Sequence, residues 1–181
     1  MRRVTLFLLL LFVYSCQFNK SNSNDPQFII DQAMEVSGSD TLANATILFE
    51  FRNRSYQASR KNGLFELVRE FTDSTGVIKD VLSNSGFQRF RNEVPVDLDD
   101  TMASKYASSV NSVHYFSVLP YGLNDTAVKK RFLGRLNIKG TTYAKIEISF
   151  NEDGGGEDFE DVFIYWINDD THQVDYLAYS Y

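Results

Sequence analysis

The chain has 181 residues, of which 43% are hydrophobic and 23% charged, so it has room for one ordinary domain and is neither disordered nor a protein with several membrane spans. Its formal net charge of −6 argues against nucleic acid as a partner, because phosphate binding needs a basic surface. One cysteine excludes an internal disulfide, and two histidines exclude a histidine-rich metal site.

The N-terminus has the composition of a secretory signal peptide. Two arginines, at positions 2 and 3, precede an apolar run over residues 4–14, which is shorter than the roughly 17–25 residues of a membrane span. The single cysteine follows in Val13-Tyr14-Ser15-Cys16, which resembles the lipobox of bacterial lipoproteins. The resemblance implies cleavage before Cys16 and lipidation of its thiol. The alternative is a secreted protein in which the cysteine lies there by chance.

Cleavage before Cys16 divides the chain into a signal peptide at residues 1–15, a lipidated cysteine with a flexible polar tether at residues 16–25, and one domain at residues 26–181. It lowers the 18 basic residues to 16 against 24 acidic ones, a net charge of −8. Acyl chains contribute about 0.8 kcal/mol per buried CH₂, so they anchor such a protein at a membrane without a basic patch. Gln17 is not the aspartate that retains similar lipoproteins at the inner membrane. The resemblance therefore favours a cell-envelope lipoprotein of the outer membrane, with the leaflet left open.

The domain is predicted to begin with a helix and to continue as strands. Asp25 and Pro26 form a typical helix start, apolar residues recur at helical spacing up to Met34, and Gly38 ends the helix. Alternating apolar and polar residues then predict strands, with a hairpin turn at Lys61-Asn62-Gly63. These strands are expected at residues 47–52, 63–71, 77–82 and 87–91.

A second helix is predicted from Asp99 onward, with an apolar stripe that includes Met102 and Val110. Pro120 closes the apolar run that follows, so the chain is expected to leave helical geometry near Leu119. Four further strands are expected at residues 128–138, 142–150, 162–168 and 174–181. Because no internal repeat and no second core are visible, the pattern predicts a single α+β domain built on antiparallel strands.

This order of elements resembles the outer-membrane lipoprotein carrier and receptor proteins of Gram-negative bacteria, the LolA/LolB-like superfamily. The resemblance rests on the helix at residues 26–37, the strands at 47–71, and the closing runs at 143–150 and 162–168. It implies a strongly curved antiparallel sheet that forms an incomplete barrel. It also implies that the N-terminal helix and the mid-chain helix pack on or in the concave face.

The chain is also similar to a family of lipoproteins that share four short motifs. The motifs are Asn111-Ser112-Val113, Leu119-Pro120, Leu123-Asn124-Asp125 and Asp175-Tyr176-Leu177-Ala178-Tyr179. This similarity implies membership of a lipoprotein group and carries no mechanism.

A curved sheet that is too small to close leaves an apolar face, which side chains or a ligand must fill. The residues expected on that face are Phe49, Phe51, Phe65, Phe71, Phe87, Phe90, Ile146, Ile148, Phe163 and Tyr165. One interpretation is a groove for a lipid or the acyl chain of a lipoprotein, bound by burial of apolar surface at roughly 25 cal/mol per Å². The other is a solid core, in which case the sheet surface binds another envelope protein.

Between the second helix and the next strand lies a candidate lid, because Pro120 and Gly122 can hinge an apolar flap. Its residues are Tyr115, Phe116, Leu119, Pro120, Tyr121 and Leu123. The alternative is a helix-to-strand connection packed into the core.

The loop at residues 151–161 carries six carboxylates and three consecutive glycines. Calcium needs 6–8 oxygen ligands, and Asp153, Glu157, Asp158 and Asp161 are the candidates to supply them. The spacing matches no calcium-loop template, so a solvated acidic loop is the default and neither a metal nor a cofactor is predicted.

Catalytic motifs are absent from the sequence. Neither G-x-S-x-G nor H-E-x-x-H occurs, the imidazoles are His114 and His172, and lipidation consumes Cys16. A lyase of the (β/α)₈ type needs about 200 or more residues and alternating helices. The sequence therefore predicts a lipid-anchored, non-enzymatic envelope protein that binds an apolar or amphiphilic ligand. An interaction module is the first alternative, and a hydrolase or lyase that uses His114 is the weakest.

Overall fold

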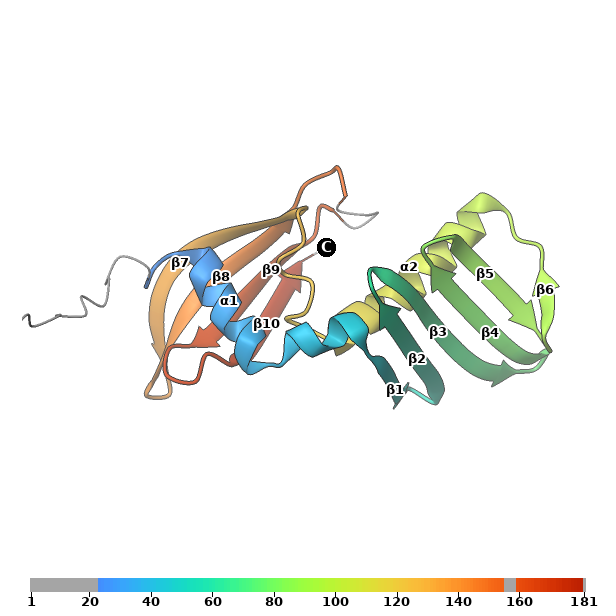
Figure 1. Cartoon of the computed structure of the whole chain (residues 1–181), viewed down its shortest axis with the longest axis horizontal. Helices are drawn as coiled ribbons and strands as arrows, with labels where there is room; N and C mark the ends of the chain where they lie inside the picture. The colour runs from blue at the N-terminus through green and yellow to red at the C-terminus, as the bar shows by residue number, and fades with distance from the viewer. Residues whose placement is uncertain (1–22, 155–158, 181) are drawn as a thin grey trace, which may run out of the picture.

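The computed structural model describes residues 23–154 and 159–180, in which two antiparallel sheets and two α-helices form an α+β fold (Figure 1). The helices are α1 (Pro26–Val36), the 3₁₀ helix η1 (Ser39–Asn44) and α2 (Asp100–Ser117). The strands are β1 (Thr46–Phe51), β2 (Arg54–Lys61), β3 (Leu64–Asp73), β4 (Gly76–Ser83), β5 (Gly86–Arg91), β6 (Val94–Val96), β7 (Val128–Ile138), β8 (Thr141–Phe150), β9 (Val162–Asn168) and β10 (Val174–Ser180). The predicted α+β class with antiparallel strands is confirmed. The predicted signal peptide and Cys16 lie outside the described residues.

Strands β1 to β6 follow one another as an antiparallel meander. The turn between β2 and β3 lies where the sequence predicts it: Asn62 and Gly63 have φ values of +53° and +80°, as a two-residue hairpin turn requires. Strand β2 itself was not predicted, because Tyr56 and Ala58 are its only apolar residues. Both of these side chains are buried, so two inward positions are enough to hold the strand in the sheet.

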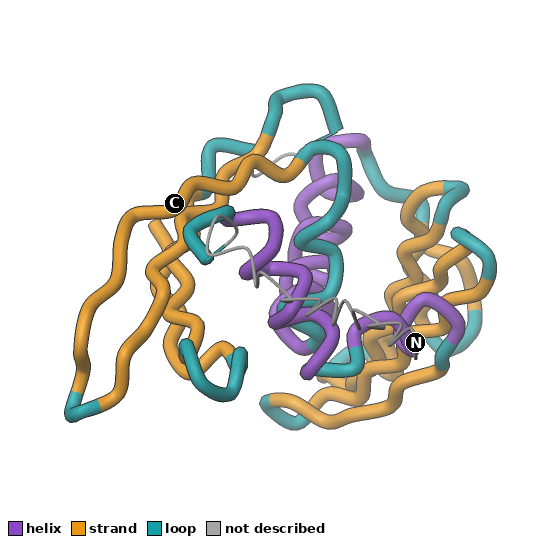
Figure 2. Tube along the Cα trace, turned by 60° about the vertical axis from the view of Figure 1, so that its left-hand side comes forward, coloured by secondary structure: helices purple, strands orange, loops and turns teal. Residues whose placement is uncertain are grey.

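Helix α2 lies across one face of this six-stranded sheet. The Asp99 carboxylate accepts a hydrogen bond of 2.9 Å from the Met102 N–H, so the predicted helix start is confirmed. Val110 is fully buried and packs with Ala58 and Leu67 of the sheet. From there the helix runs toward the four-stranded sheet and lies between the two sets of strands (Figure 2).

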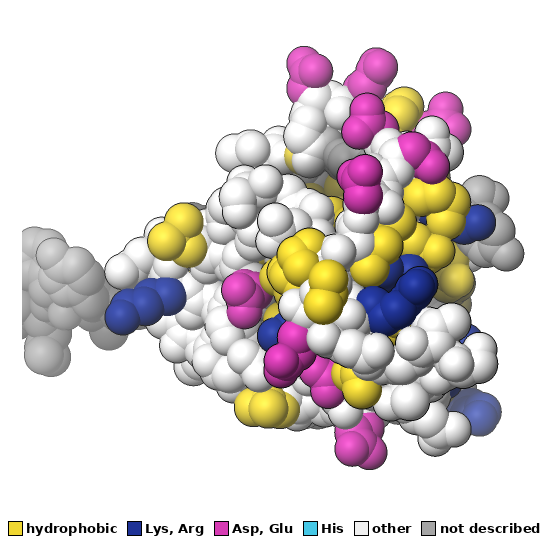
Figure 3. All heavy atoms as spheres, turned by 90° about the vertical axis from the view of Figure 1, so that its right-hand side faces the viewer, with side chains coloured by type: hydrophobic (Ala, Val, Ile, Leu, Met, Phe, Trp, Pro, Cys, Tyr) yellow, Lys and Arg dark blue, Asp and Glu magenta, His cyan; other side chains and the backbone are white. Residues whose placement is uncertain are grey.

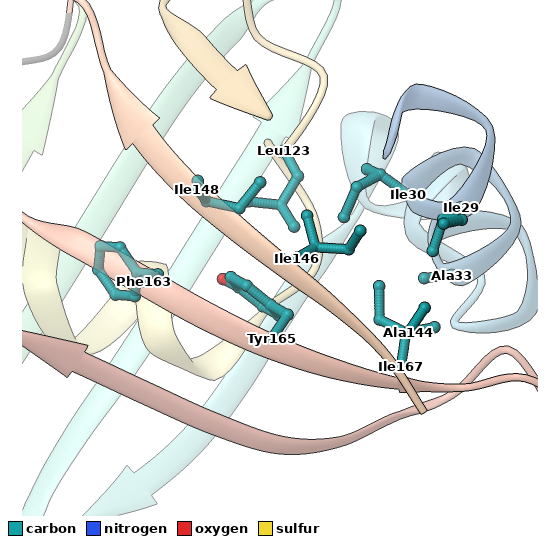
Figure 4. Packing of buried hydrophobic residues seen from close by; sticks show 10 residues of the cluster. All are labelled: Ile29, Ile30, Ala33, Leu123, Ala144, Ile146, Ile148, Phe163, Tyr165 and Ile167. Carbon is teal, nitrogen blue, oxygen red and sulfur yellow. The ribbon is translucent and has the colours of Figure 1, made fainter. Parts of the chain in front are cut away.

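The four-stranded sheet has the order β10-β9-β8-β7, and α1 packs on it. The Asp25 carboxylate caps α1 by accepting a 3.0 Å hydrogen bond from the Gln27 N–H. Ile29 and Ile30 of this helix point into the sheet's core (Figure 4). An isolated helix of 11 residues is marginal in water, so this packing is what stabilises α1.

The strands form two sheets rather than the single sheet that the sequence predicted. Between β6 and β7 the chain passes through α2 and the connection at residues 118–127, and β6 does not pair with β7. The edge strands are β1 and β6 in one sheet and β7 and β10 in the other. Among the described residues, no helix has the length and apolar character needed to cross a membrane.

Candidate functional site

Four of the predicted groove residues lie in the core of the four-stranded sheet. Ile146, Ile148 and Tyr165 have no exposed side-chain surface, and Phe163 is 3% exposed. Helix α1 lies beside Ile146, and Leu123 lies beside Ile148 (Figure 4). Phe163 lies farther from α1, with the rings of Tyr115, Phe116, Phe150 and Tyr179 around it. The structure therefore places these four side chains in a packed core and not in an open groove, because neighbouring side chains bury them almost completely.

The remaining groove candidates belong to the six-stranded sheet. Phe65 and Phe87 pack against the cluster beneath α2, and Phe71 lies 4.4 Å below the guanidinium of Arg54. Phe90 alternates with the inward-pointing Arg89 and therefore faces the opposite side of the sheet. Phe49 and Phe51 of β1 remain, and both border open space.

The candidate lid is mostly a packed connection. Leu123 is fully buried, Leu119 packs against the core of the four-stranded sheet, and burial raises the pKa of Tyr115 to about 12. Pro120 is buried, and Tyr121 is half-buried with the Arg60 guanidinium 5.3 Å from its ring centroid. Phe116 is different, since 38% of its surface is exposed.

A groove of about 530 Å³ lies along the C-terminal half of α2, between the end of β1 and the end of β10, and we call it the junction groove. Its apolar lining is Phe49, Phe51, Val113, Phe116 and Tyr179. These residues come from the end of β1, the C-terminal half of α2 and the end of β10. The Phe116 ring lies 5.2 Å from that of Tyr179 and 5.8 Å from that of Phe163, which joins the helix to the four-stranded sheet.

The two strands that border the junction groove are both edge strands. Each carries exposed apolar side chains: Phe51 of β1 is 45% exposed, and Tyr179 of β10 is 50% exposed. Exposed apolar surface that is gathered in one concave place marks a binding site more often than scattered exposed side chains do.

A second cavity, of about 230 Å³, adjoins the junction groove and shares Phe51, Arg52 and Val113 with it. We call it the arginine pocket, because Arg52, Arg54 and Arg69 all line it. No carboxylate is among the described residues that line this pocket. Figure 3 views the molecule from the end that carries β5 and β6, and basic side chains lie beside hydrophobic ones on that end as well.

Arg69 is held in place by a buried ion-pair network. Its Nε and Nη2 donate to Asp80 Oδ2 at 3.0 and 2.6 Å, and its Nη1 donates to Ser109 Oγ of α2 at 2.8 Å. Arg89 donates to the same carboxylate, at 2.6 Å to Oδ1 and 2.9 Å to Oδ2. Asp80 is fully buried, so this network places two guanidinium groups around one carboxylate beneath α2.

His114 is buried and has the geometry of a structural side chain. Its ring stands edge-on to Phe49 and Tyr56, and its Nε2–H donates to the Val68 carbonyl at 3.0 Å. Burial lowers the pKa of His114, and the charges of Arg60 and Arg69 lower it further. The sequence suggested His114 as a catalytic base in the weakest alternative, but its imidazole is only 1% exposed in the structure. His172 lies in the turn between β9 and β10, with its Nε2 3.3 Å from Gln32 Nε2.

The lowered pKa of His114 gives a testable pH dependence. The unfolded chain binds a proton at this imidazole near pH 6.5, whereas the folded protein binds it only at lower pH. Because the unfolded state then holds more protons, the free energy of unfolding is expected to fall as pH drops below about 6.5. Urea unfolding between neutral pH and pH 5 measures this slope. His114→Gln, which keeps an N–H donor for Val68 and does not titrate, is expected to flatten it; an unchanged slope contradicts the assignment.

The calcium candidates are only partly described. Asp153 and Asp161 belong to the described residues, whereas Glu157 and Asp158 lie outside them. Within residues 23–154 and 159–180, no three side chains of histidine, cysteine, aspartate or glutamate gather as a metal site would require.

Sequence reasoning missed the arginines and Tyr179. Arg69 lies on the same side of β3 as Leu67 and Phe71. A charged residue in a row of alternating apolar positions indicates a buried charge, and this signal was present in the sequence. Tyr179 gave no such signal, because its partner Phe116 is far away in the sequence and an aromatic residue in a strand is ordinary.

A family model described as "Family of unknown function (DUF6503)" matches residues 2–181. No curated protein matches the chain. Since the match spans nearly the whole sequence, the chain belongs to the DUF6503 family.

Proposed function

We propose that this member of the DUF6503 family is a lipid-anchored, non-enzymatic envelope protein that binds the hydrocarbon chain of a lipid or lipoprotein in the junction groove. The junction groove itself carries the proposal: its volume of about 530 Å³ falls in the range of roughly 300–1,000 Å³ that is typical of small-molecule sites. Its aromatic lining supplies apolar surface, and each buried CH₂ of a ligand contributes about 0.8 kcal/mol.

In this proposal the two sheets are the curved walls of an incomplete barrel, and α2 lies between them. The support is that the edge strands β1 and β10 both border the junction groove. The four-stranded wall is filled by α1, so the ligand is expected at the junction of the walls and not beneath α1.

The groove can be tested by filling it. Ser112 is exposed on α2 and lines the junction groove, so Ser112→Trp puts an indole into the groove without disturbing the core. Asn111→Trp, on the neighbouring exposed position that does not line the groove, is the matched control. Calorimetric titration with sodium laurate is expected to show binding to the wild type and to Asn111→Trp, and at least about tenfold weaker binding to Ser112→Trp. Equal affinity in all three proteins, or no binding to any of them, contradicts the proposal.

Lipid anchoring through Cys16 is a separate prediction, because Cys16 lies outside the residues that the structure describes. Cys16→Ser is expected to move the protein from the membrane fraction to the soluble fraction, because no thiol remains to accept acyl chains. Intact mass measurement of the mature wild-type protein is expected to show cleavage before Cys16 and the added mass of acyl groups. An unmodified thiol on the mature chain contradicts the anchor.

A second candidate function is an interaction module for another envelope protein. Two observations favour it: the filled core under α1, and apolar side chains exposed on the edge strands, with Leu48 72% exposed and Leu177 37% exposed. Unpaired strand edges are ready templates for pairing with another chain. Crosslinking in cells that captures one defined partner, together with a failure to bind laurate, distinguishes this function from lipid binding.

A further inference from the structure

We infer that the ligand of the junction groove is an amphiphile whose end carries one anionic group, a carboxylate or a phosphate, and that Arg52 and Arg54 bind this group in the arginine pocket. The inference rests on the proposed function and adds the chemical class of the ligand. Its first support is continuity: Phe51, Arg52 and Val113 line both cavities, so a chain in the groove brings its end to the arginines.

The second support is charge. The whole chain has a net charge of −6, yet three arginines line this small pocket. Arg69 is already paired with Asp80 and hydrogen-bonded to Ser109, but no ion pair joins Arg52 or Arg54 to a carboxylate in the described residues. Asp80 is shared between the guanidinium groups of Arg69 and Arg89, so one carboxylate does not neutralise both of them and the network beside the pocket stays positive.

The third support is the way the two arginines are held. The Arg52 guanidinium lies 5.0 Å from the centroid of the Phe51 ring, and that of Arg54 lies 4.4 Å from the centroid of the Phe71 ring. An aromatic face orients a guanidinium and uses none of its N–H donors, which stay available for the two oxygens of a carboxylate or phosphate. Glu50 is the one carboxylate that lines the groove in the described part of the chain, and it does not line the arginine pocket.

The two probes that test this inference differ only at the end of the chain: sodium laurate and its neutral glycerol monoester, monolaurin. Laurate is expected to bind the wild type at least about tenfold more tightly than monolaurin at low salt, with the difference shrinking as salt is added. The double variant Arg52→Gln/Arg54→Gln is expected to lose that difference by weakening laurate binding alone. Inorganic phosphate, the probe for an anion without a chain, is expected to compete poorly.

The control removes the same charge elsewhere. Lys105→Gln/Lys129→Gln changes two exposed lysines that line neither cavity, and it is expected to keep the preference for laurate. Equal binding of both probes to the wild type overturns the inference and leaves the proposed function standing. Phosphate that competes as strongly as laurate also overturns it, because the site then recognises an anion alone. Binding of neither probe contradicts the proposed function itself.

Discussion

Asp80→Asn is expected to lower the free energy of unfolding by about 3–5 kcal/mol, which is among the largest effects available in this fold. The carboxylate is fully buried and accepts hydrogen bonds from Arg69 and Arg89, which are 3% and 12% exposed. Asparagine has nearly the same shape and no charge, so the substitution leaves two desolvated guanidinium groups without a counterion. The cost comes from these uncompensated charges and not from the removal of one favourable contact.

Urea unfolding of wild type and variant measures this cost, and Glu147→Gln is the matched control. Glu147 also pairs with an arginine, Arg131, at 2.6 Å, but the Arg131 side chain is 67% exposed and water replaces the lost partner. The control is therefore expected to unfold close to the wild type. Similar losses in both variants, or none in Asp80→Asn, contradict the assignment of a buried network that holds the sheet and α2 together.

Ile146→Ala is expected to lower the free energy of unfolding by about 2–5 kcal/mol. Ile146 is fully buried between the four-stranded sheet and α1, so the shorter side chain leaves a cavity that its neighbours fill only in part. The prediction also separates two interpretations of the sequence. Shortening a residue that lines an open groove lowers the free energy of unfolding only slightly, whereas shortening a core residue lowers it by several kcal/mol.

The control for Ile146→Ala is Leu48→Ala on the edge strand β1. Leu48 is 72% exposed, so its removal is expected to change the free energy of unfolding by no more than about 0.5 kcal/mol. Chemical unfolding of both variants, with m-values compared to the wild type, checks the difference. A small change in Ile146→Ala contradicts the filled core that moves the ligand site to the junction groove.

Local signals in the sequence predicted most of the elements. Asp25 and Asp99 predict the starts of α1 and α2, because a carboxylate at the N-cap position accepts a hydrogen bond from a backbone N–H of the first turn. The Asn62-Gly63 turn could be predicted because those residue types reach positive φ at low cost. Strand β2 was not predicted because its pattern is mostly polar. No local signal shows that Ala58 packs with Val110 of α2, or that the Tyr56 ring packs against His114 of the same helix.

The division into two sheets and the position of the site could not be predicted in the same way. Whether β6 pairs with β7 depends on where α2 and the connection after it lie, which is a property of the assembled fold. The junction groove brings together residues 49–52, 112–113, 116–117 and 179, which no local pattern relates. The predicted inward face mixed residues of both sheets, and only Phe49 and Phe51 among them line the groove.

Mapping the backbone amide signals of the protein by nuclear magnetic resonance, as sodium laurate is added, tests the central claim most directly. The account predicts shifts that saturate and that concentrate at the end of β1, along the C-terminal half of α2 and at the end of β10, where the junction groove and the arginine pocket lie. Shifts centred on α1 and the core of the four-stranded sheet, or no saturable shifts at any concentration below micelle formation, would contradict it.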